Sequence, residues 1–429
     1  MLINTYEEIG QEDTTGIAAL LREQTEAQQD VTEVVLSIIE GVKKNGDAAL
    51  VEFTERYDGV RLEQAALELP VSAGRVALNA LDVKTRGALE KAAERIEAFS
   101  RECLNRDWTF EPASGITVGQ VSRPLQTVGL YLPGGRFAYP STVLMTGIPA
   151  RCAGVKEIIC CIPPGDGGDI NNVTVAATAL VGGCRVFRVG GAQAIAAMAY
   201  GTETVPKCLM VSGPGNMYVA TAKRLVSGVV TVDTEAGPSE ILIYADAGAR
   251  ASYVVADLMA QLEHDPHALA ALITESDDLI KDARKRLEAL DADSKGSVSL
   301  LASAGREQSL ALINAIAPEH LELMVDDAES LLPSIMTAGC VFLGPWSAVT
   351  MGDYIAGPSH VLPTGGSAAR LSGLSALDFT RTMNVVSYTQ EGFAVDAEHA
   401  RLLAGIEGLE NHARSIEIRT GGESSQVEV

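Results

Sequence analysis

The alternation of short apolar runs with small-residue stretches between residues 127 and 239 constrains the fold of this chain most strongly. Runs typical of buried β-strands recur at Val128–Leu132, Glu157–Ile162, Arg185–Val189, Cys208–Val211 and Val229–Asp233. Stretches of helical length separate them, at residues 141–153, 173–182, 192–200 and 216–226. Strands that alternate with helices predict a parallel sheet with helices on both faces. Right-handed crossovers make such a sheet a Rossmann-like doubly wound unit.

A second series of the same kind begins at Glu240. Its strands are expected at residues 240–244, 269–274, 297–301, 321–325 and 340–343, and its helices at 251–264, 277–290, 306–316 and 328–338. The predicted fold class is therefore α/β, with two Rossmann-like doubly wound parallel-sheet units, a short N-terminal arm and a helical C-terminal tail.

Four parts follow from this pattern. Residues 1–23 are polar and look like an arm, and residues 127–239 form the first α/β domain. Residues 24–126 are mainly helical, and we expect them to pack onto the second unit, so that 24–126 plus 240–374 form one domain. Residues 375–429 are a helical tail. One apolar stripe on its last helix, with His412 beside it, consists of Leu402, Ile406, Leu409, Ala413 and Ile416.

Composition excludes several classes of function. A net charge of −23 over 429 residues argues against nucleic acid or an anionic membrane surface as a partner. No apolar run reaches the length of a membrane span, and the first residues lack the features of a signal peptide. The seven cysteines include no C-x-x-C pair and indicate reduced thiols. We therefore expect a cytoplasmic protein.

Glycine-rich turns collect where the predicted strands meet the helices. They are Tyr131-Leu-Pro-Gly-Gly135, Gly190-Gly-Ala-Gln193, Gly213-Pro-Gly-Asn216 and Gly237-Pro-Ser-Glu240. Glycine lets the backbone approach a ligand closely, and a helix N-terminus suits an anion such as pyrophosphate. Each turn alone could simply connect two elements, and no G-x-G-x-x-G is present. Together, at the carboxyl edge where doubly wound sheets bind ligands, they favour a binding site.

The predicted helix at residues 251–264 ends with two potential metal ligands. Gln261 and His264 are three residues apart and so lie side by side on a helix surface. Asp265-Pro266 then ends the helix. A lone Q-x-x-H pair is a weak metal motif, and a partly buried histidine beside a solvated glutamine explains it equally well.

Further candidates for chemistry lie downstream. Glu319 and His320 stand between a predicted helix and strand and could act as a proton-transfer pair, although adjacent residues need not face one site. Asp353 and His360 fall in polar, glycine-containing loops. A mixed nitrogen and oxygen set that suits zinc, with manganese or cobalt as alternatives, would consist of Gln261, His264, Asp353 and His412.

The order of these motifs closely resembles the histidinol dehydrogenase family over about residues 30 to 419. The motifs that carry the resemblance are Tyr131-Leu-Pro-Gly-Gly, Gly190-Gly-Ala-Gln-Ala-Ile, Gly213-Pro-Gly-Asn, Ala236-Gly-Pro-Ser-Glu, Gln261-Leu-Glu-His-Asp, Ala317-Pro-Glu-His-Leu-Glu, Gly352-Asp-Tyr, His360-Val-Leu-Pro-Thr-Gly-Gly and Glu407-Gly-Leu-Glu-Asn-His412.

The resemblance implies an enzyme that oxidises L-histidinol to L-histidine through histidinal and reduces two NAD⁺. It implies that residues 127–239 bind NAD⁺ and that the domain of 24–126 plus 240–374 holds substrate and one zinc ion per subunit. His320 would be the general base and Glu319 would activate water on histidinal. The implied zinc ligands, which also surround the substrate, are Gln261, His264, Asp353 and His412.

The resemblance also implies the remaining contacts. Substrate would touch Ser239, His320, His360 and Glu407 besides the zinc ligands. Family members are homodimers in which the tail of one chain completes the partner's site, so that Glu407 and His412 would act across the interface. The implied NAD⁺ contacts are Tyr131, Gln193 and Asn216.

Two departures from the family pattern concern neighbours of these residues. Ser359 stands where asparagine is expected, and Thr234-Glu235 stands where an apolar pair is expected. Three alternatives remain open: a relative that oxidises another amino alcohol, a zinc hydrolase that uses Glu319 to activate water, and a non-catalytic metal- or nucleotide-binding protein. The glycine-rich strand ends argue against the hydrolase, and the adjacent Glu319 and His320 argue against the non-catalytic protein.

Overall fold

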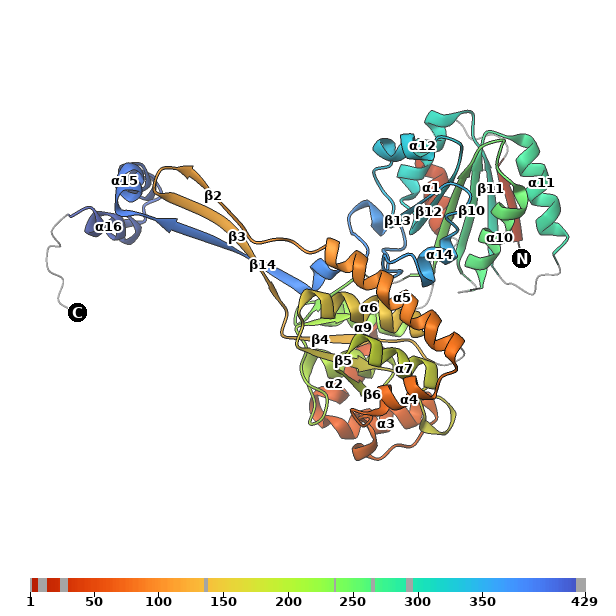
Figure 1. Ribbon diagram of the computed structural model, residues 1–429, viewed down its shortest axis with the longest axis horizontal. Helices are drawn as coiled ribbons and strands as arrows, with labels where there is room; N and C mark the ends of the chain where they lie inside the picture. Colours follow the sequence, from red (N-terminus) through yellow and green to blue (C-terminus); the bar gives the residue numbers. More distant parts are fainter. Residues whose placement is uncertain are drawn as a thin grey trace. The chain divides into compact units, whose positions relative to one another are not determined.

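The computed structural model confirms the predicted fold class and divides the chain into two compact units. The larger unit comprises Met1–Leu104 and Leu125–Phe379, and the smaller comprises Asn105–Pro124 and Thr380–Val429. The larger unit contains two parallel sheets with helices on both faces (Figure 1). The structure describes residues 2–6, 14–23, 30–134, 138–234, 237–263, 267–290 and 296–421.

The first sheet has the strand order β6-β5-β4-β7-β8, with all neighbours parallel. Its strands are β4 (Thr127–Tyr131), β5 (Glu157–Cys161), β6 (Cys184–Phe187), β7 (Met210–Ser212) and β8 (Thr231–Val232). Successive side chains of a strand point to opposite faces, so Ile158 and Ile159 enter different hydrophobic clusters. The crossover helices are α6 (Pro140–Ala153), α7 (Asn172–Val181), α8 (Gly191–Tyr200) and α9 (Met217–Val226).

The helices that precede this sheet pack onto it, and the expectation that they pack onto the second unit is wrong. They are α2 (Thr32–Asn45), α3 (Asp47–Asp58), α4 (Ala73–Ala80) and α5 (Val83–Glu102). The apolar stripes of α2 and α3 share one cluster with α8 and α9, whereas α4 and α5 share the opposite cluster with α6 and α7. Two crossover helices leave part of each sheet face open, and the early helices bury that area.

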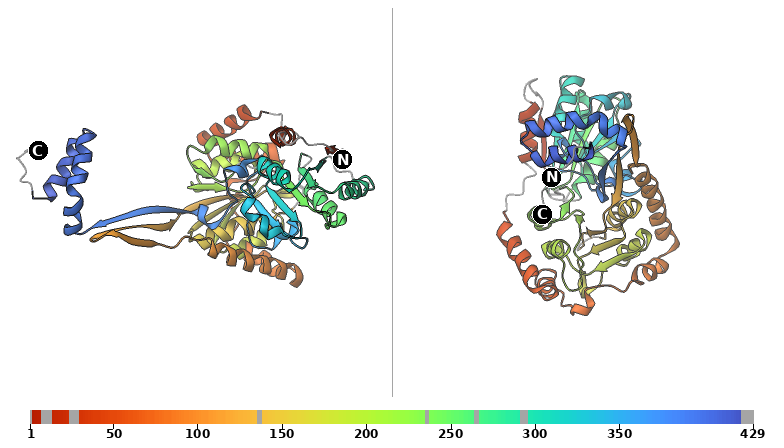
Figure 2. Two further views of the ribbon diagram at one scale, coloured as in Figure 1. Left: turned by 90° about the horizontal axis from the view of Figure 1, so that it is seen from above. Right: turned by 90° about the vertical axis from the view of Figure 1, so that its left-hand side faces the viewer.

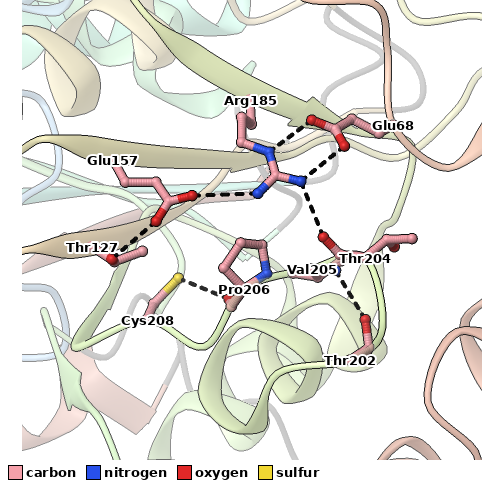
Figure 3. Close-up of polar contacts among 9 residues, drawn as sticks. All are labelled: Glu68, Thr127, Glu157, Arg185, Thr202, Thr204, Val205, Pro206 and Cys208. Carbon is pink, nitrogen blue, oxygen red and sulfur yellow. Dashed lines mark hydrogen bonds and ion pairs between the residues drawn. The ribbon is translucent and has the colours of Figure 1, made fainter.

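An ion-pair network holds this early segment against the sheet (Figure 3). Arg185 of β6 donates through Nε and Nη2 to both carboxylate oxygens of Glu68, at 2.7 and 2.9 Å. The same guanidinium also donates to Glu157 at 3.3 Å and to the carbonyl oxygen of Thr204 at 3.2 Å. A bidentate pair of this kind fixes orientation as well as position.

The second sheet has the order β1-β11-β10-β9-β12-β13, again with all neighbours parallel. Its later strands are β9 (Glu240–Ala245), β10 (Leu269–Thr274), β11 (Ser297–Ala302), β12 (His320–Met324) and β13 (Cys340–Leu343). The helices that cover it are α10 (Ala251–Leu262), α11 (Asp277–Glu288), α12 (Arg306–Ile316), α13 (Ala328–Leu331) and α14 (Val349–Tyr354). α13 is shorter than the predicted helix at 328–338 because Pro333 lies in the next turn.

Residues 1–23 are not an arm without a core, because they complete this second sheet. Strand β1 (Leu2–Tyr6) pairs in parallel with β11 at the sheet edge. Helix α1 (Thr14–Glu23) buries Ile17, Ala18 and Leu21 in one of the two clusters of that sheet. The second sheet, whose other strands all follow residue 240, therefore has its edge strand β1 from the N-terminal part of the chain.

The smaller unit contains a three-stranded antiparallel sheet that the sequence analysis missed. The order is β14-β3-β2, formed by β2 (Trp108–Ala113), β3 (Ile116–Pro124) and β14 (Thr380–Tyr388). The tail is thus not wholly helical, since β14 precedes two packed helices, α15 (Gln390–Ile406) and α16 (Glu410–Arg419) (Figure 2). Gly408, at φ 72°, separates them, so the predicted single apolar stripe is divided between two helices.

The cysteines are free thiols, as predicted. Burial raises the pKa of the Cys208 thiol to about 12, which keeps it protonated near neutral pH. Within the described ranges, no helix has both the length and the apolar character needed to cross a membrane.

Candidate active site

The predicted catalytic residues lie at the amino edge of the second sheet. Strand β9 begins at Glu240 and its parallel neighbour β12 begins at His320, which pairs with Ile241. The turn Gly237–Glu240 therefore precedes its strand, and the expectation that all four glycine-rich turns share a carboxyl edge is wrong for this one. It lies at an amino edge because it carries the chain from the end of one sheet directly into the start of the next.

Crossover helices return further candidates to this edge. Helix α10 follows β9 and runs back along it, so that Gln261 falls in its last turn. Gln261 is 2% exposed, and its Nε2 is buried without a hydrogen-bond partner within the described part of the chain. His264 lies outside the described residues. Asp353 comes from α14, and its Oδ1 is 3.7 Å from Nε2 of His320.

His320 is held in one orientation. Its Nδ1 donates to the carbonyl oxygen of Glu240 at 2.9 Å, which leaves Nε2 as the lone-pair nitrogen. That Nε2 is buried without a hydrogen-bond partner among the described residues. Burial opposes protonation, but the nearby carboxylates of Glu319, at 3.5 Å, and Asp353 outweigh it and raise the pKa of His320 well above its usual value.

Glu319 is equally constrained, and its partner Glu240 is a site residue that the sequence analysis missed. Oε2 of Glu319 accepts from the backbone N–H of Glu240 at 2.8 Å, and Oε2 of Glu240 accepts from the N–H of Glu319 at 3.3 Å. Glu240 also accepts from the N–H of Gly365 at 2.7 Å. The sequence feature that could have identified Glu240 is a carboxylate at the first position of an otherwise apolar strand.

His360 joins this group through Asp353 and is kept neutral. Its Nδ1 donates to the carbonyl oxygen of Asp353 at 2.9 Å, and its Nε2 accepts from Oγ1 of Thr142 at 3.1 Å. Burial lowers the pKa of His360, so the imidazole is uncharged near neutral pH. Thr142, from α6, was not predicted and had no sequence signal.

The candidate cofactor residues lie at the carboxyl edge of the first sheet. Tyr131 ends β4, and its hydroxyl accepts from the N–H of Gly191 at 3.3 Å. Gln193, in the first turn of α8, is 1% exposed, with Nε2 buried and without a partner among the described residues. Asn216 caps α9 by accepting from two backbone N–H groups, at 3.1 and 3.2 Å. At Gly213 a side chain would collide with the carbonyl of Tyr131.

Among the described residues, the hydrogen bonds of this network involve none of the remaining candidates. Ser239 is half-buried before β9. Glu407 and His412 are exposed residues of the smaller unit, at the end of α15 and on α16. Within the described ranges no group of His, Cys, Asp and Glu is arranged as a metal site. Ser359, the first departure, accepts from the N–H of Val361 at 3.2 Å and so stabilises a turn.

The chain places a histidine and a carboxylate at one edge of a doubly wound sheet and glycine-rich turns at an edge of another, an arrangement typical of dinucleotide-dependent enzymes. The comparisons with known proteins make this specific, because the family model of histidinol dehydrogenase matches residues 21–420. The chain therefore belongs to the histidinol dehydrogenase family, whose members oxidise histidinol in histidine biosynthesis.

Individual relatives match over nearly their whole length. The chain is 43% identical to histidinol dehydrogenase from Syntrophotalea carbinolica, over 91% of this chain and 93% of that protein. It is 43% identical to the enzyme from Pseudomonas aeruginosa, over 93% of both chains. The crystal structure of histidinol dehydrogenase from Elizabethkingia anophelis superposes with a TM-score of 0.91 at 31% identity, covering 97% of this chain and 98% of that one.

Proposed function

We propose that this chain oxidises L-histidinol to L-histidine in two steps through histidinal, with Glu319 and His320 as the proton-transfer pair. The observation that carries the proposal is the geometry of His320. One ring nitrogen, Nδ1, donates to the Glu240 carbonyl and lies 3.5 Å from Glu319. The other, Nε2, is buried 3.7 Å from Asp353 and has no hydrogen-bond partner in the described part of the chain. A cation bound beside Asp353 would offset the charge of that carboxylate and so favour the neutral ring, whose lone pair on Nε2 suits removal of a proton from a substrate hydroxyl.

Each residue then has a distinct task. His320 takes the hydroxyl proton as a hydride leaves the adjacent carbon of histidinol. Glu319 activates water for addition to the aldehyde, and His320 serves again when the hydrate is oxidised. Ser239, His360 and, from a second copy of the chain, Glu407 are proposed to contact the substrate. The neutral imidazole of His360 is suited to a hydrogen bond with an uncharged polar group.

Zinc is proposed as the resident metal, one ion per subunit. Gln261 fits the ion because Nε2 of its buried amide has no hydrogen-bond partner among the described residues, and because reversing the amide would present the oxygen instead. The proposed ligands are Gln261, His264, Asp353 and His412 from a second copy of the chain. When bound, the ion would orient the imidazole and amino nitrogens of the substrate and offset the charge of Asp353.

NAD⁺ is proposed to bind the domain of residues 127–239 and to accept a hydride in each step. Three observations support this: Nε2 of the buried Gln193 has no partner among the described residues, the backbone approaches closely at Gly213, and α9 begins at the exposed Asn216. Tyr131 is also proposed to contact the cofactor; burial raises the pKa of its hydroxyl to about 12, so that the hydroxyl stays neutral.

We also propose a homodimer in the cytoplasm, with the smaller unit as the dimerisation tail. Exposed apolar side chains are concentrated on this unit, which is unusual for a surface that faces only water. Free cysteines fit a reducing compartment. The exposed apolar residues include Trp108, Phe110, Val385, Val386, Tyr388, Val395, Leu402, Leu403, Ile406 and Ile418.

The test is NADH formation from L-histidinol, before and after chelation and after zinc is restored. We expect about two NADH per histidinol consumed, loss of turnover with chelator and recovery with zinc. About one NADH with release of aldehyde would contradict the two-step reaction. No NADH while zinc stays bound would favour a different amino alcohol as substrate.

A further inference from the structure

The segment that links the two sheets of the larger unit is fastened to the loop that carries His360. The N–H of Gly237 donates to Oγ1 of Thr364 at 2.5 Å, and the hydroxyl of Thr234 donates to the carbonyl of Leu362 at 3.5 Å. The third of these contacts joins Oε1 of Glu240 to the N–H of Gly365, at 2.7 Å.

Glu240 also holds both members of the proton-transfer pair. Its carbonyl orients His320, its N–H holds the carboxylate of Glu319, and its own carboxylate accepts the N–H of Glu319. Every hydrogen-bonding group of this one residue thus acts on the pair or on the loop. We propose that Glu240 is a positioning residue whose carboxylate sets the orientation of Glu319 and ties it to the His360 loop.

The energetic setting favours this role over a purely structural one. Glu240 is 2% exposed and lies beside a second carboxylate, an arrangement that costs folding free energy. Burial and the neighbouring Glu319 raise the pKa of Glu240 to about 7, although N–H donors from Gly365 and Glu319 and the charge of Arg22 oppose the shift. A neutral side chain of the same size would fill the space without that cost.

The inference rests on the proposed function, and the Glu240→Gln variant of the full chain tests it. Gln keeps the shape but replaces one acceptor oxygen with a donor group that faces a backbone N–H. We expect the kcat for L-histidinal with NAD⁺ to fall by about tenfold to a hundredfold, with KM changed by less than about threefold. The melting temperature should stay the same or rise, a result that a structural role would not give.

A double-mutant cycle with Glu319→Gln shows whether Glu240 acts through Glu319. In the Glu319→Gln background, Glu240→Gln should cause little further loss of the histidinal rate. Glu240→Asp, which keeps the charge but shortens the reach, should lose histidinal oxidation as well. Glu275→Gln is the matched control, because this exposed carboxylate lies beside the same sheet and accepts hydrogen bonds from the hydroxyls of Tyr244 and Ser309, outside the network of Glu319 and His320.

The outcomes separate the inference from the function on which it rests. No NADH from the native chain overturns the proposed function and the inference with it. A native chain that turns over, with Glu240→Gln as active as Glu275→Gln, overturns the inference alone. So does a multiplicative loss in the double variant, or a fall in melting temperature without a fall in rate per folded molecule.

Discussion

The two parallel sheets of the larger unit have matching strand orders but place their candidate functional residues at opposite edges. In each, the chain winds outward in one direction and then returns to the middle, which gives a switch point between β4 and β7 and another between β9 and β12. Tyr131 ends β4 at the carboxyl edge of the first sheet, as doubly wound folds predict. Glu240 and His320 begin β9 and β12, at the amino edge of the second.

The switch point of a doubly wound sheet therefore determines between which two strands the functional residues lie. It does not determine whether they lie at the carboxyl or the amino edge of the sheet. The short segment from Thr234 to Ser239 leads from the carboxyl end of β8 straight into the amino end of β9. The carboxyl edge of the first sheet is therefore continuous along the chain with the amino edge of the second sheet. In the proposed function, the substrate lies near the second edge and NAD⁺ at the first, so that this short connection joins the two binding sites.

The sheets also differ in the charges that they bury. In the first, Nζ of Lys223 contacts the carboxylate of Asp233 and donates to the carbonyl oxygens of Gly213 and Thr234, at 3.1 and 2.9 Å. In the second, the like-charged Glu322 of β12 lies beside Asp257 of α10. A buried lysine and a buried carboxylate stabilise each other's charge. Two buried carboxyl groups avoid repulsion only when at least one of them holds a proton.

The largest effect is expected from His320→Ala at the amino edge of the second sheet. Loss of the base should lower kcat for histidinol by about a thousandfold, while NAD⁺ binding and zinc content stay near native. Steady-state NADH formation, calorimetric NAD⁺ binding and metal analysis measure the three quantities. His399→Ala, at an exposed histidine of α15, is the control. Loss of zinc in His320→Ala would show that ligand and base had been exchanged.

Gly339→Ala tests whether the amino edge must stay closely packed. A Cβ on Gly339 would lie 2.5 Å from the backbone oxygen of Glu319, so the peptide that carries the pair must shift. We expect kcat to fall by about tenfold or more and stability to drop by about 1–3 kcal/mol. Gly87→Ala, in α5 with open space around it, should be neutral or stabilising. A fully active Gly339→Ala would show that Glu319 tolerates displacement.

Gln193→Ala tests the carboxyl edge of the first sheet. We expect the KM for NAD⁺ to rise by about tenfold, because a buried amide that binds the cofactor is lost, with a smaller change in kcat. Gln308→Ala is a matched control, since Gln308 is also buried near the start of a crossover helix but belongs to the second sheet. If both variants bind NAD⁺ like the native chain, the proposed division of labour between the sheets fails.

The smallest effect on turnover is expected from Glu322→Gln. Burial and Asp257 raise the pKa of Glu322 to about 9, so the folded state loses stability as pH rises from the unfolded pKa near 4.5 toward 9. The variant should therefore gain roughly 1–3 kcal/mol over the native chain at pH 8 and nothing below about pH 4.5. Urea unfolding across this range measures the difference. An advantage that does not grow with pH would contradict the buried carboxyl pair.

Local patterns were sufficient for the class of fold and for most members of the site. The alternation of apolar runs and helical stretches predicts both sheets, because strand and helix periodicity are short-range properties. Glu319 and His320 were predicted to lie together because they are adjacent in sequence. Tyr131 was predicted to lie at the end of its strand because it is part of the apolar run that forms that strand. Two strands of the smaller unit were missed because β14 is largely exposed and β2 is exposed throughout, so neither has a buried apolar face.

The sequence by itself determined that this is a doubly wound α/β enzyme of the histidinol dehydrogenase family, because the motifs that identify the family follow one another in a fixed order along the chain. Only the tertiary structure decided that β1 completes the second sheet and that the early helices cover the first. It also decided that the carboxylate of Glu240 accepts hydrogen bonds from the N–H groups of Glu319 and Gly365. These pairings join residues far apart in the chain. These pairings form because part of each sheet face would otherwise stay exposed to water, and because buried polar groups need hydrogen-bond partners. Neither requirement can be read from a short stretch of sequence.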